Sequence, residues 1–332
     1  MSYSEDTEEM VQHWHHLMGL WRPNLRSSIR TFVDVEIYGG WGLPFSGGEP
    51  LFTHQDGAGW SSDHIDHIRS QYDEAGAPRM RLPGEERFAL LSFPGAYTFG
   101  HWYVDVCPRL ETLARFFDLG SLKYLVPGPL PGWARIFLSA YGIQPEQLVE
   151  LTDEKVIVVS RLIVPDLVRN SDYLPAFPHL HTFQRLRAAV APAASEAPLT
   201  GHAENLFVIH SPMTSAGSRR TLSNAAELSV LLEARGFRTV EPATMSFAEQ
   251  VAVFNNARLI VGEDSSALHN IIYSSTASLH VLNGDSRVNY LHLSICRLLG
   301  HDCSYQICQA EGANSFTCDP RQLIEWIERA TV

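Results

Sequence analysis

The chain has 332 residues, a formal net charge of −12 and 45% hydrophobic residues, enough for two domains that each bury a core. The acidic balance argues against a nucleic-acid binder, because such proteins need a basic surface. No stretch reaches the roughly 18 apolar residues that span a bilayer, the acidic N-terminus lacks a signal-peptide pattern, and five scattered cysteines without a CxxC pair indicate reduced thiols, so we expect a cytoplasmic protein.

The N-terminal part of the chain shows irregular patterns. Residues 1–85 give no clear period. Beyond them, apolar runs and helical patterns predict elements in this order: a strand over 88–94, a helix over 100–117 with a proline near its middle, a strand over 123–128, a helix over 131–142, and strands over 148–151 and 155–165.

The C-terminal part alternates strands and helices more regularly. Strands are predicted over 205–211, 237–242, 258–262 and 277–283, and helices over 224–236, 246–257, 265–275, 288–300 and 319–330. Capping boxes are expected at Asn224 with Glu227 and at Ser246 with Glu249; Gly236 ends the first helix, and Asp319 caps the last. Alternating strands and helices predict a parallel sheet with helices on both faces. The Ala-, Pro- and Ser-rich residues 191–204 are expected to link an N-terminal domain (1–190) to a C-terminal domain (205–318), which the last helix (319–332) follows.

The segment from Glu263 to Asn270 carries the strongest chemical signal. It follows a buried strand directly, and the start of a helix at the carboxyl end of a parallel strand offers free N–H groups to an anion. Ser265, Ser266 and Ala267 are small enough to let an anion approach. The alternative is an ordinary serine-capped helix. No GxGxxG motif follows any strand, which argues against a nicotinamide or flavin enzyme.

Two further segments hold candidate site residues. Arg219 and Arg220 precede a helix, where their guanidinium groups suit a diphosphate, although a solvated loop with two exposed arginines is the simpler interpretation of this segment alone. His101 stands one helical turn before Asp105, and an imidazole oriented by a carboxylate is a good general base near neutral pH. The alternative is a structural histidine with an ion pair between Asp105 and Arg109.

The histidines near the N-terminus give only a weak metal signal. His15, His16, His64 and His67 lack a third ligand at a suitable spacing, so solvent-facing side chains are the simpler interpretation. Glu249 is explained by its capping box, whereas Gln250 beside it has no such duty.

Four ordered stretches of the chain resemble glycosyltransferase family 61, and the segment RVNYLHLSICRLLGHDCSYQI is similar to its bacterial capsular-polysaccharide branch. They are FGHWYVDVCPRLETL, KYLVPGPLPGWARIFLSAYGI, RRTLSNAAEL and GFRTVEPATMSFAEQVAVFNNARLIVGEDSSALHN. The family pattern matches His101, Trp102, Asp105, Pro108, Arg109, Arg220, Asn224, Ser246, Phe247, Glu249, Gln250, Gly262, Leu268 and Asn270. Asp264 and Ser265 replace a common His-Gly pair, and His210 and Ser211 replace a common Ser-Arg pair, which leaves Arg219 or Arg220 to supply the phosphate charge.

The resemblance implies an α/β fold of the GT-B type, with two Rossmann-like domains facing each other across a cleft. It implies inverting, metal-independent transfer of a sugar from a nucleoside diphosphate, with uridine diphosphate (UDP) as first candidate, to a hydroxyl group of a glycan or other acceptor. No cofactor is expected. The resemblance is also compatible with peripheral association of the protein with a membrane-bound polysaccharide assembly complex. The implied catalytic residues are His101 and Asp105. The implied donor-binding residues are Arg219, Arg220, Asn224, Glu249, Gln250, Glu263, Asp264, Ser265, Ser266, Ala267 and Asn270.

Two other functions stay open at this point. A non-catalytic sugar- or nucleotide-binding subunit of an assembly complex would bind a nucleotide without turnover. A metal-dependent hydrolase would use the histidines of residues 54–67.

Overall fold

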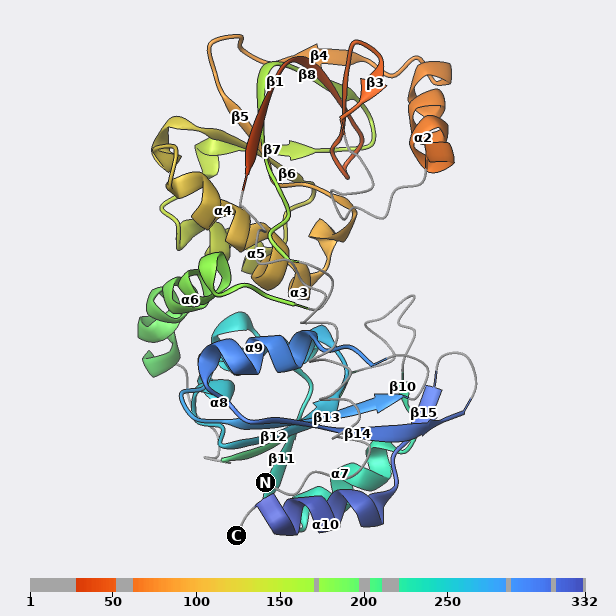
Figure 1. The fold of residues 1–332 in the computed structure, drawn as a ribbon, viewed down its shortest axis with the longest axis vertical. Coiled ribbons are helices and arrows are strands. Elements are labelled where there is room, and N and C mark those ends of the chain that lie inside the picture. Colours follow the sequence, from red (N-terminus) through yellow and green to blue (C-terminus); the bar gives the residue numbers. More distant parts are fainter. Residues whose placement is uncertain are drawn as a thin grey trace. The chain divides into compact units, whose positions relative to one another are not determined.

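The computed structural model describes residues 28–51, 62–169, 173–196, 204–210, 221–284, 288–311 and 315–330. Its chain forms two compact units. One comprises Asn24–Arg169 and Pro175–Leu186 and is called the N-terminal unit; the other centres on Arg187–Val332 and is called the C-terminal unit. Each has its own sheet (Figure 1), so the fold is mixed α/β.

The N-terminal unit is built on a mixed sheet with the strand order β3-β2-β1-β8-β5-β6-β7, and β4 also pairs with β8. The strands are β1 (Ile29–Tyr38), β2 (Leu43–Ser46), β3 (Glu49–Pro50), β4 (Arg79–Arg81), β5 (Phe88–Leu90), β6 (Lys123–Pro127), β7 (Leu148–Leu151) and β8 (Val156–Pro165). The pairs β1–β2, β2–β3 and β1–β8 are antiparallel, whereas β5, β6 and β7 run parallel. The sheet is therefore mixed, and not the all-parallel sheet that strictly alternating strands and helices would form. The antiparallel strands β1, β2 and β3 come from residues 1–85, whose sequence shows no clear hydrophobic period.

Helices complete this unit. They are α2 (Ser62–Glu74), α3 (Phe99–His101), α4 (Cys107–Ala114), α5 (Gly132–Ser139) and α6 (Ala176–Glu196). Ile65, Ile68 and Tyr72 of α2 pack into the same apolar core as Ile37 and Val156 of the central strands. Since α6 reaches Glu196, the expected linker begins as a helix, and an alanine-rich sequence is compatible with that state.

The C-terminal unit is more regular. Its strands are β9 (Asn205–Val208), β10 (Thr221–Leu222), β11 (Phe237–Val240), β12 (Leu259–Glu263), β13 (Ser278–Gly284), β14 (Cys303–Ala310) and β15 (Ser315–Thr317), in the order β10-β15-β14-β13-β12-β9-β11. The run from β11 to β14 is parallel, as predicted. In chain order these five strands lie 2-1-3-4-5, a doubly wound arrangement whose order reverses between β9 and β12.

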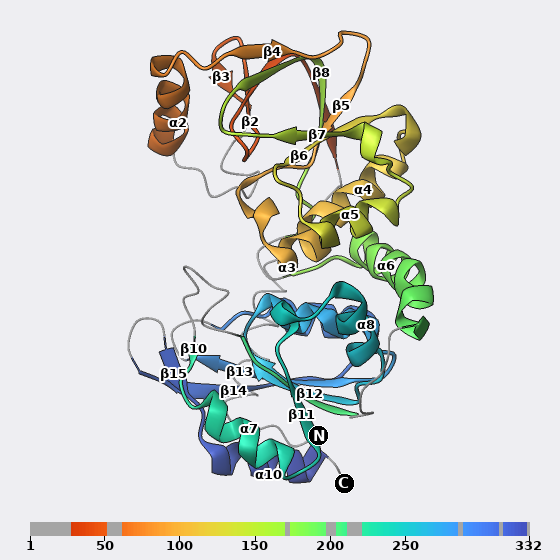
Figure 2. The ribbon, with the colours of Figure 1, turned by 180° about the vertical axis from the view of Figure 1, so that it is seen from behind.

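Helices cover both faces of this second sheet, as predicted. They are α7 (Ala225–Glu233), α8 (Phe247–Asn255), α9 (Leu291–Leu299) and α10 (Pro320–Ala330). Figures 1 and 2 show α7 and α10 on one face and α8 and α9 on the other. Leu228, Leu323 and Ile327 of the first pair pack against Phe207 and Val261 of the strands.

Local capping follows the sequence in most places. Ser246 and Glu249 form the predicted capping box, Gly236 ends its helix with a φ of +81°, and Asp319 accepts a hydrogen bond from the N–H of Arg321. The box predicted at Asn224 is wrong. Its side chain instead pairs with the backbone of Cys318, accepting at 3.1 Å and donating at 2.9 Å, because that extended segment lies beside the helix start.

The segment after β12 forms a 3₁₀-helix (η7, Ser266–Tyr273) rather than the predicted α-helix. The N–H of Leu268 donates to the carbonyl of Ser265 at 3.1 Å, three residues back. Leu268 also packs on Gly262, where an added Cβ would lie 2.7 Å from its side chain. This close packing holds the short connection in the tighter helical form.

Candidate functional site

The first group of site residues lies on a helix that contains a π-helical turn. α3, the π-turn Trp102–Val106 and α4 follow one another without a break. Pro108 has no N–H to donate to the carbonyl of Val104, four residues back. The ring of His179, on α6, occupies that carbonyl instead, with its Nε2 2.9 Å from the oxygen. π-turns of this kind often mark functional sites.

His101 and Asp105 meet on this helix. Nδ1 of His101 lies 2.5 Å from Oδ2 of Asp105. The Asp105 side chain has no exposed surface, whereas 34% of the His101 side chain is exposed. Because the carboxylate accepts at Nδ1, it favours the tautomer in which Nε2 keeps its lone pair.

Arg169, four residues after the end of β8, contacts the other oxygen of Asp105. Its Nε lies 2.7 Å from Oδ1. Burial would raise the pKa of the Asp105 carboxyl, but the hydrogen bond from His101 and the charge of Arg169 outweigh it and lower the pKa to about 2. The alternative ion pair with Arg109 is wrong, because that guanidinium lies over the ring of Phe93, 4.8 Å from its centroid.

Two neighbours restrict the His101 ring. The ring of Phe93 meets it edge-on, with centroids 5.7 Å apart. A Cβ added to Gly95 would lie 3.0 Å from the imidazole. The imidazole is thus held on three sides: by Phe93, by Gly95 and by the carboxylate.

Sequence reasoning missed His179 and Arg169, since both lie more than 60 residues from Asp105. His179 is fully buried, and burial lowers its pKa to about 4. Its Nδ1 lies 3.1 Å from the carbonyl of Pro175. His179 stands within the largely apolar run LPAFPHL, a signal that could have identified it, whereas Arg169 precedes three polar residues and carries no such signal.

The second group lies at the carboxyl ends of β9 and β12, where the strand order reverses. Doubly wound folds bind ligands at such a point. Glu263, at the end of β12, is 2% exposed and accepts hydrogen bonds from the N–H groups of His210 and Leu222. Burial raises the pKa of its carboxyl to about 7, although those two N–H groups favour the charged form.

Asp264 turns into the unit. Its Oδ1 lies 2.9 Å from Nε2 of His292 and 3.3 Å from Nδ2 of Asn289, and only 2% of its side chain is exposed. The imidazole of His269 packs beside that of His292, with centroids 5.2 Å apart. Asp264 is therefore engaged with α9 and the residues before it.

Ser265 occupies the N-cap position of η7, but its hydroxyl makes no capping bond. Its Oγ is buried without a hydrogen-bond partner among the residues that the structure describes. Such an oxygen is costly unless a further group pairs with it. The alternative of an ordinary serine-capped helix is therefore wrong here.

Gln250 and Asn270 are brought together. Nδ2 of Asn270 donates to Oε1 of Gln250 at 2.9 Å, and Nε2 of Gln250 donates to the carbonyl of Pro242 at 2.8 Å. Asn270 is fully buried, so the pair ties α8 to η7. Glu249 faces away in its capping box.

The remaining predicted residues either lie outside the described residues or are exposed elsewhere. Arg219, Arg220, Ser211, His15 and His16 lie outside the described residues, as does the side chain of His64. His67 and Asp66 are exposed on α2. Within the described ranges, no three histidine, cysteine, aspartate or glutamate side chains gather closely enough to hold a metal ion. The same ranges contain no helix that is long and apolar enough to cross a membrane.

Comparison with known proteins gives one clear result. No curated protein matches the chain. The family model described as Glycosyltransferase 61 matches residues 99–280, more than half of the chain. This range begins just before His101 and ends in β13, so it includes both groups of residues. Members of this family transfer sugars, and a sugar donor and an acceptor are therefore implied. The chain belongs to the glycosyltransferase 61 family.

Proposed function

We propose that the protein is an inverting glycosyltransferase that uses a nucleoside-diphosphate sugar, UDP being the first candidate, and a hydroxyl acceptor. One observation carries this proposal: Nδ1 of His101 lies 2.5 Å from a buried, ionised Asp105, while 34% of the His101 side chain is exposed. That is the arrangement of a general base.

The base acts on the acceptor. Nε2 of His101 takes the proton of the acceptor hydroxyl while its oxygen attacks the anomeric carbon from the side opposite the diphosphate. The bond from that carbon to the diphosphate breaks, which inverts the anomeric configuration. Asp105 stabilises the imidazolium that forms, and Arg169 keeps Asp105 in place.

The leaving diphosphate is assigned to the C-terminal unit. The N–H groups of Ser265, Ser266 and Ala267 start η7 beside the switch point, and the buried Ser265 hydroxyl is a further donor. Arg219 and Arg220 would add positive charge, so no divalent cation is needed. The unit that carries His101 would then bind the acceptor, as in GT-B enzymes. A role in bacterial surface polysaccharide synthesis, on the cytoplasmic side of the membrane, follows from the resemblance of the sequence.

A screen of nucleoside-diphosphate sugars for hydrolysis and transfer tests the activity, and calorimetry with UDP tests the donor site. We expect Arg220→Ala to weaken UDP binding about 10- to 150-fold, the loss of a charge-assisted hydrogen bond of roughly 1.5–3 kcal/mol. Arg235→Ala, an exposed arginine at the end of α7, is the matched control and should bind normally.

The outcomes separate the candidate functions. Unchanged UDP affinity in Arg220→Ala would transfer the role to Arg219. Thermal stabilisation by UDP without turnover of any donor would show the non-catalytic binding subunit instead.

A further inference from the structure

We propose that a pocket in the N-terminal unit binds a saccharide, and that it holds an oligosaccharide acceptor for the transfer described above; this assignment rests on the proposed function. The pocket has a volume of about 680 Å³, within the usual range for small-molecule sites of ~300–1,000 Å³. It lies between the turn that joins β1 to β2, the helix α2 and the turn before β8. The polar and aromatic residues that line it include Trp41, Gln71, Tyr72, Asp153 and Glu154.

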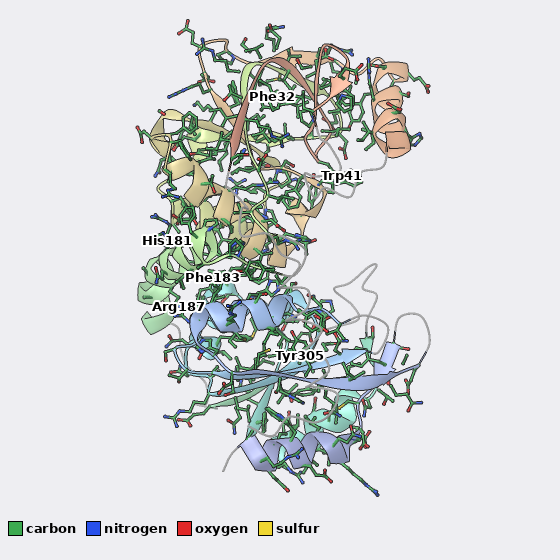
Figure 3. The ribbon with its side chains drawn as sticks, viewed as in Figure 1. Phe32, Trp41, His181, Phe183, Arg187 and Tyr305 are labelled. Carbon is green, nitrogen blue, oxygen red and sulfur yellow. The ribbon has the colours of Figure 1, made fainter. Side chains whose placement is uncertain are left out.

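Trp41 supplies an aromatic surface. It is labelled in Figure 3, and 41% of it is exposed although it lines a pocket. An indole presents a flat apolar face with a polar edge. The C–H face of a pyranose ring fits such a surface, while its hydroxyl groups stay free for hydrogen bonds.

The turn that carries Trp41 is tightly held. Gly39 and Gly42 have φ values of +66° and +72°, which other residues rarely adopt. A Cβ at Gly42 would also lie 3.0 Å from both Ser92 and Leu151. The backbone around Trp41 is thus fixed before a ligand arrives, which lowers the entropy cost of binding.

The turn before β8 supplies hydrogen-bond acceptors to the pocket. Oδ1 of Asp153 accepts from the N–H of Gly40 at 2.8 Å and from the hydroxyl of Tyr72 at 3.1 Å. Both bonds use the same oxygen, and no described residue donates to Oδ2. That oxygen and the Glu154 carboxylate can accept hydrogen bonds from vicinal sugar hydroxyls, and the amide of Gln71 can both donate and accept them.

The chemistry of the pocket also excludes other ligands. Two carboxylates repel an anion such as a phosphate. Aromatic cages for quaternary ammonium groups need several open ring faces. Here Tyr38 is only 1% exposed and meets the half-buried ring of Tyr72 edge-on, with centroids 5.8 Å apart, so the most exposed aromatic side chain of the pocket is Trp41. A neutral saccharide fits one aromatic face and an acceptor-rich wall better.

One chain segment joins this pocket to the proposed base. The hydroxyl of Ser92 donates to the carbonyl of Gly40 at 2.7 Å, and a Cβ on Gly40 would lie 2.3 Å from the hydroxyl of Tyr97. The same segment continues through Phe93, which contacts the imidazole, to His101 itself. A saccharide anchored at Trp41 is therefore bound on the structure that positions the base.

Binding of the whole protein to an array of neutral and anionic oligosaccharides, without any donor, tests the inference. We expect binding to at least one neutral oligosaccharide, at least a tenfold loss in Trp41→Ala, and partial retention in Trp41→Phe. Phe116→Ala, another exposed aromatic of the same unit but outside the pocket, is the control and should bind normally. If Trp41→Ala does not fold, as judged by circular dichroism, the exposed Gln71→Ala variant replaces it with the same expected direction.

Three results would overturn the inference: no saccharide bound by the unmodified protein, equal binding by the pocket variants, or thermal stabilisation by tetramethylammonium alone. Donor turnover is measured in parallel. Saccharide binding without turnover of any donor would refute the enzyme but not the pocket, and turnover without saccharide binding would refute the pocket but not the enzyme.

Discussion

At the scale of single residues, the candidate site depends on two buried carboxyl groups whose pKa values are shifted in opposite directions. Asp105 is buried yet ionised, because a guanidinium and an imidazole contact it. Glu263 is buried against backbone N–H groups, and burial raises its pKa to about 7. The difference follows from the partners and not from the depth of burial.

His101→Ala should lower turnover on an acceptor by roughly 10²–10⁴-fold while UDP affinity stays unchanged. The reason is that the variant loses the proton acceptor but leaves the C-terminal unit intact. Steady-state kinetics and calorimetry measure the two quantities. His67→Ala, which removes an exposed histidine of α2, is the matched control.

Near-normal turnover in a folded His101→Ala protein would exclude His101 as the base. Loss of stability and of UDP binding together would instead show a structural histidine. In the first case, Asp264 and Glu263 would be the next candidates.

Glu263 makes the stability depend on pH. Its folded-state pKa of about 7 exceeds its ordinary value of 4.5, so the native protein holds a proton that the unfolded chain has lost between these values. The resulting stability is complete below pH 4.5 and is lost as pH rises through 7. At about 1.4 kcal/mol per pKa unit, the loss reaches about 3 kcal/mol.

Urea denaturation of the unmodified protein and of Glu263→Gln over pH 4–8 measures this effect. The difference in unfolding free energy between the two should change across that range. It should stay constant for the control Glu233→Gln, an exposed glutamate of α7. If the unfolding free energies of Glu263→Gln and of the unmodified protein changed with pH in the same way, the raised pKa of Glu263 would be contradicted.

At the scale of elements, strand ends and helix starts position the proposed donor site. The parallel register of β9 and β12 sets Val208 opposite Gly262, so the residues that follow both strands emerge side by side. The pair of Gln250 and Asn270 then fixes η7 against α8. A buried amide pair of this kind stabilises only while both partners are present.

A double-mutant cycle tests this connection. Asn270→Ala should lower the free energy of unfolding by about 1–3 kcal/mol, because it removes the donor to Oε1 of Gln250. Combined with Gln250→Ala, it should show a coupling of about 1 kcal/mol in denaturant titrations. The pair Asn256→Ala and Gln250→Ala shares no hydrogen bond between its side chains and should be additive. Additivity of the first pair as well would show that the contact does not hold η7.

At the scale of the whole molecule, the net charge of −12 repels an anionic donor, so any diphosphate site must be locally positive. We expect turnover of a nucleoside-diphosphate sugar to persist after dialysis against EDTA and to gain nothing from added Mn²⁺. The proposed reason is that N–H groups and arginines provide the charge that a cation supplies elsewhere. A loss of turnover after EDTA treatment that added Mn²⁺ reverses would contradict metal independence.

The sequence by itself determined the regular elements of the C-terminal unit and the contact of His101 with Asp105. Helical and strand periods, capping residues and an i, i+4 spacing act over a few residues, so they can be read without the fold. Strand β1, which residues 1–85 did not reveal, depends on its pairing with β8 more than 110 residues later. Arg169, His179, the 2-1-3-4-5 strand order and the Trp41 pocket likewise depend on residues far apart in the chain. Only the tertiary structure could decide these features. The partner of a buried charge and the neighbour of a strand depend on packing and burial, and not on local propensity.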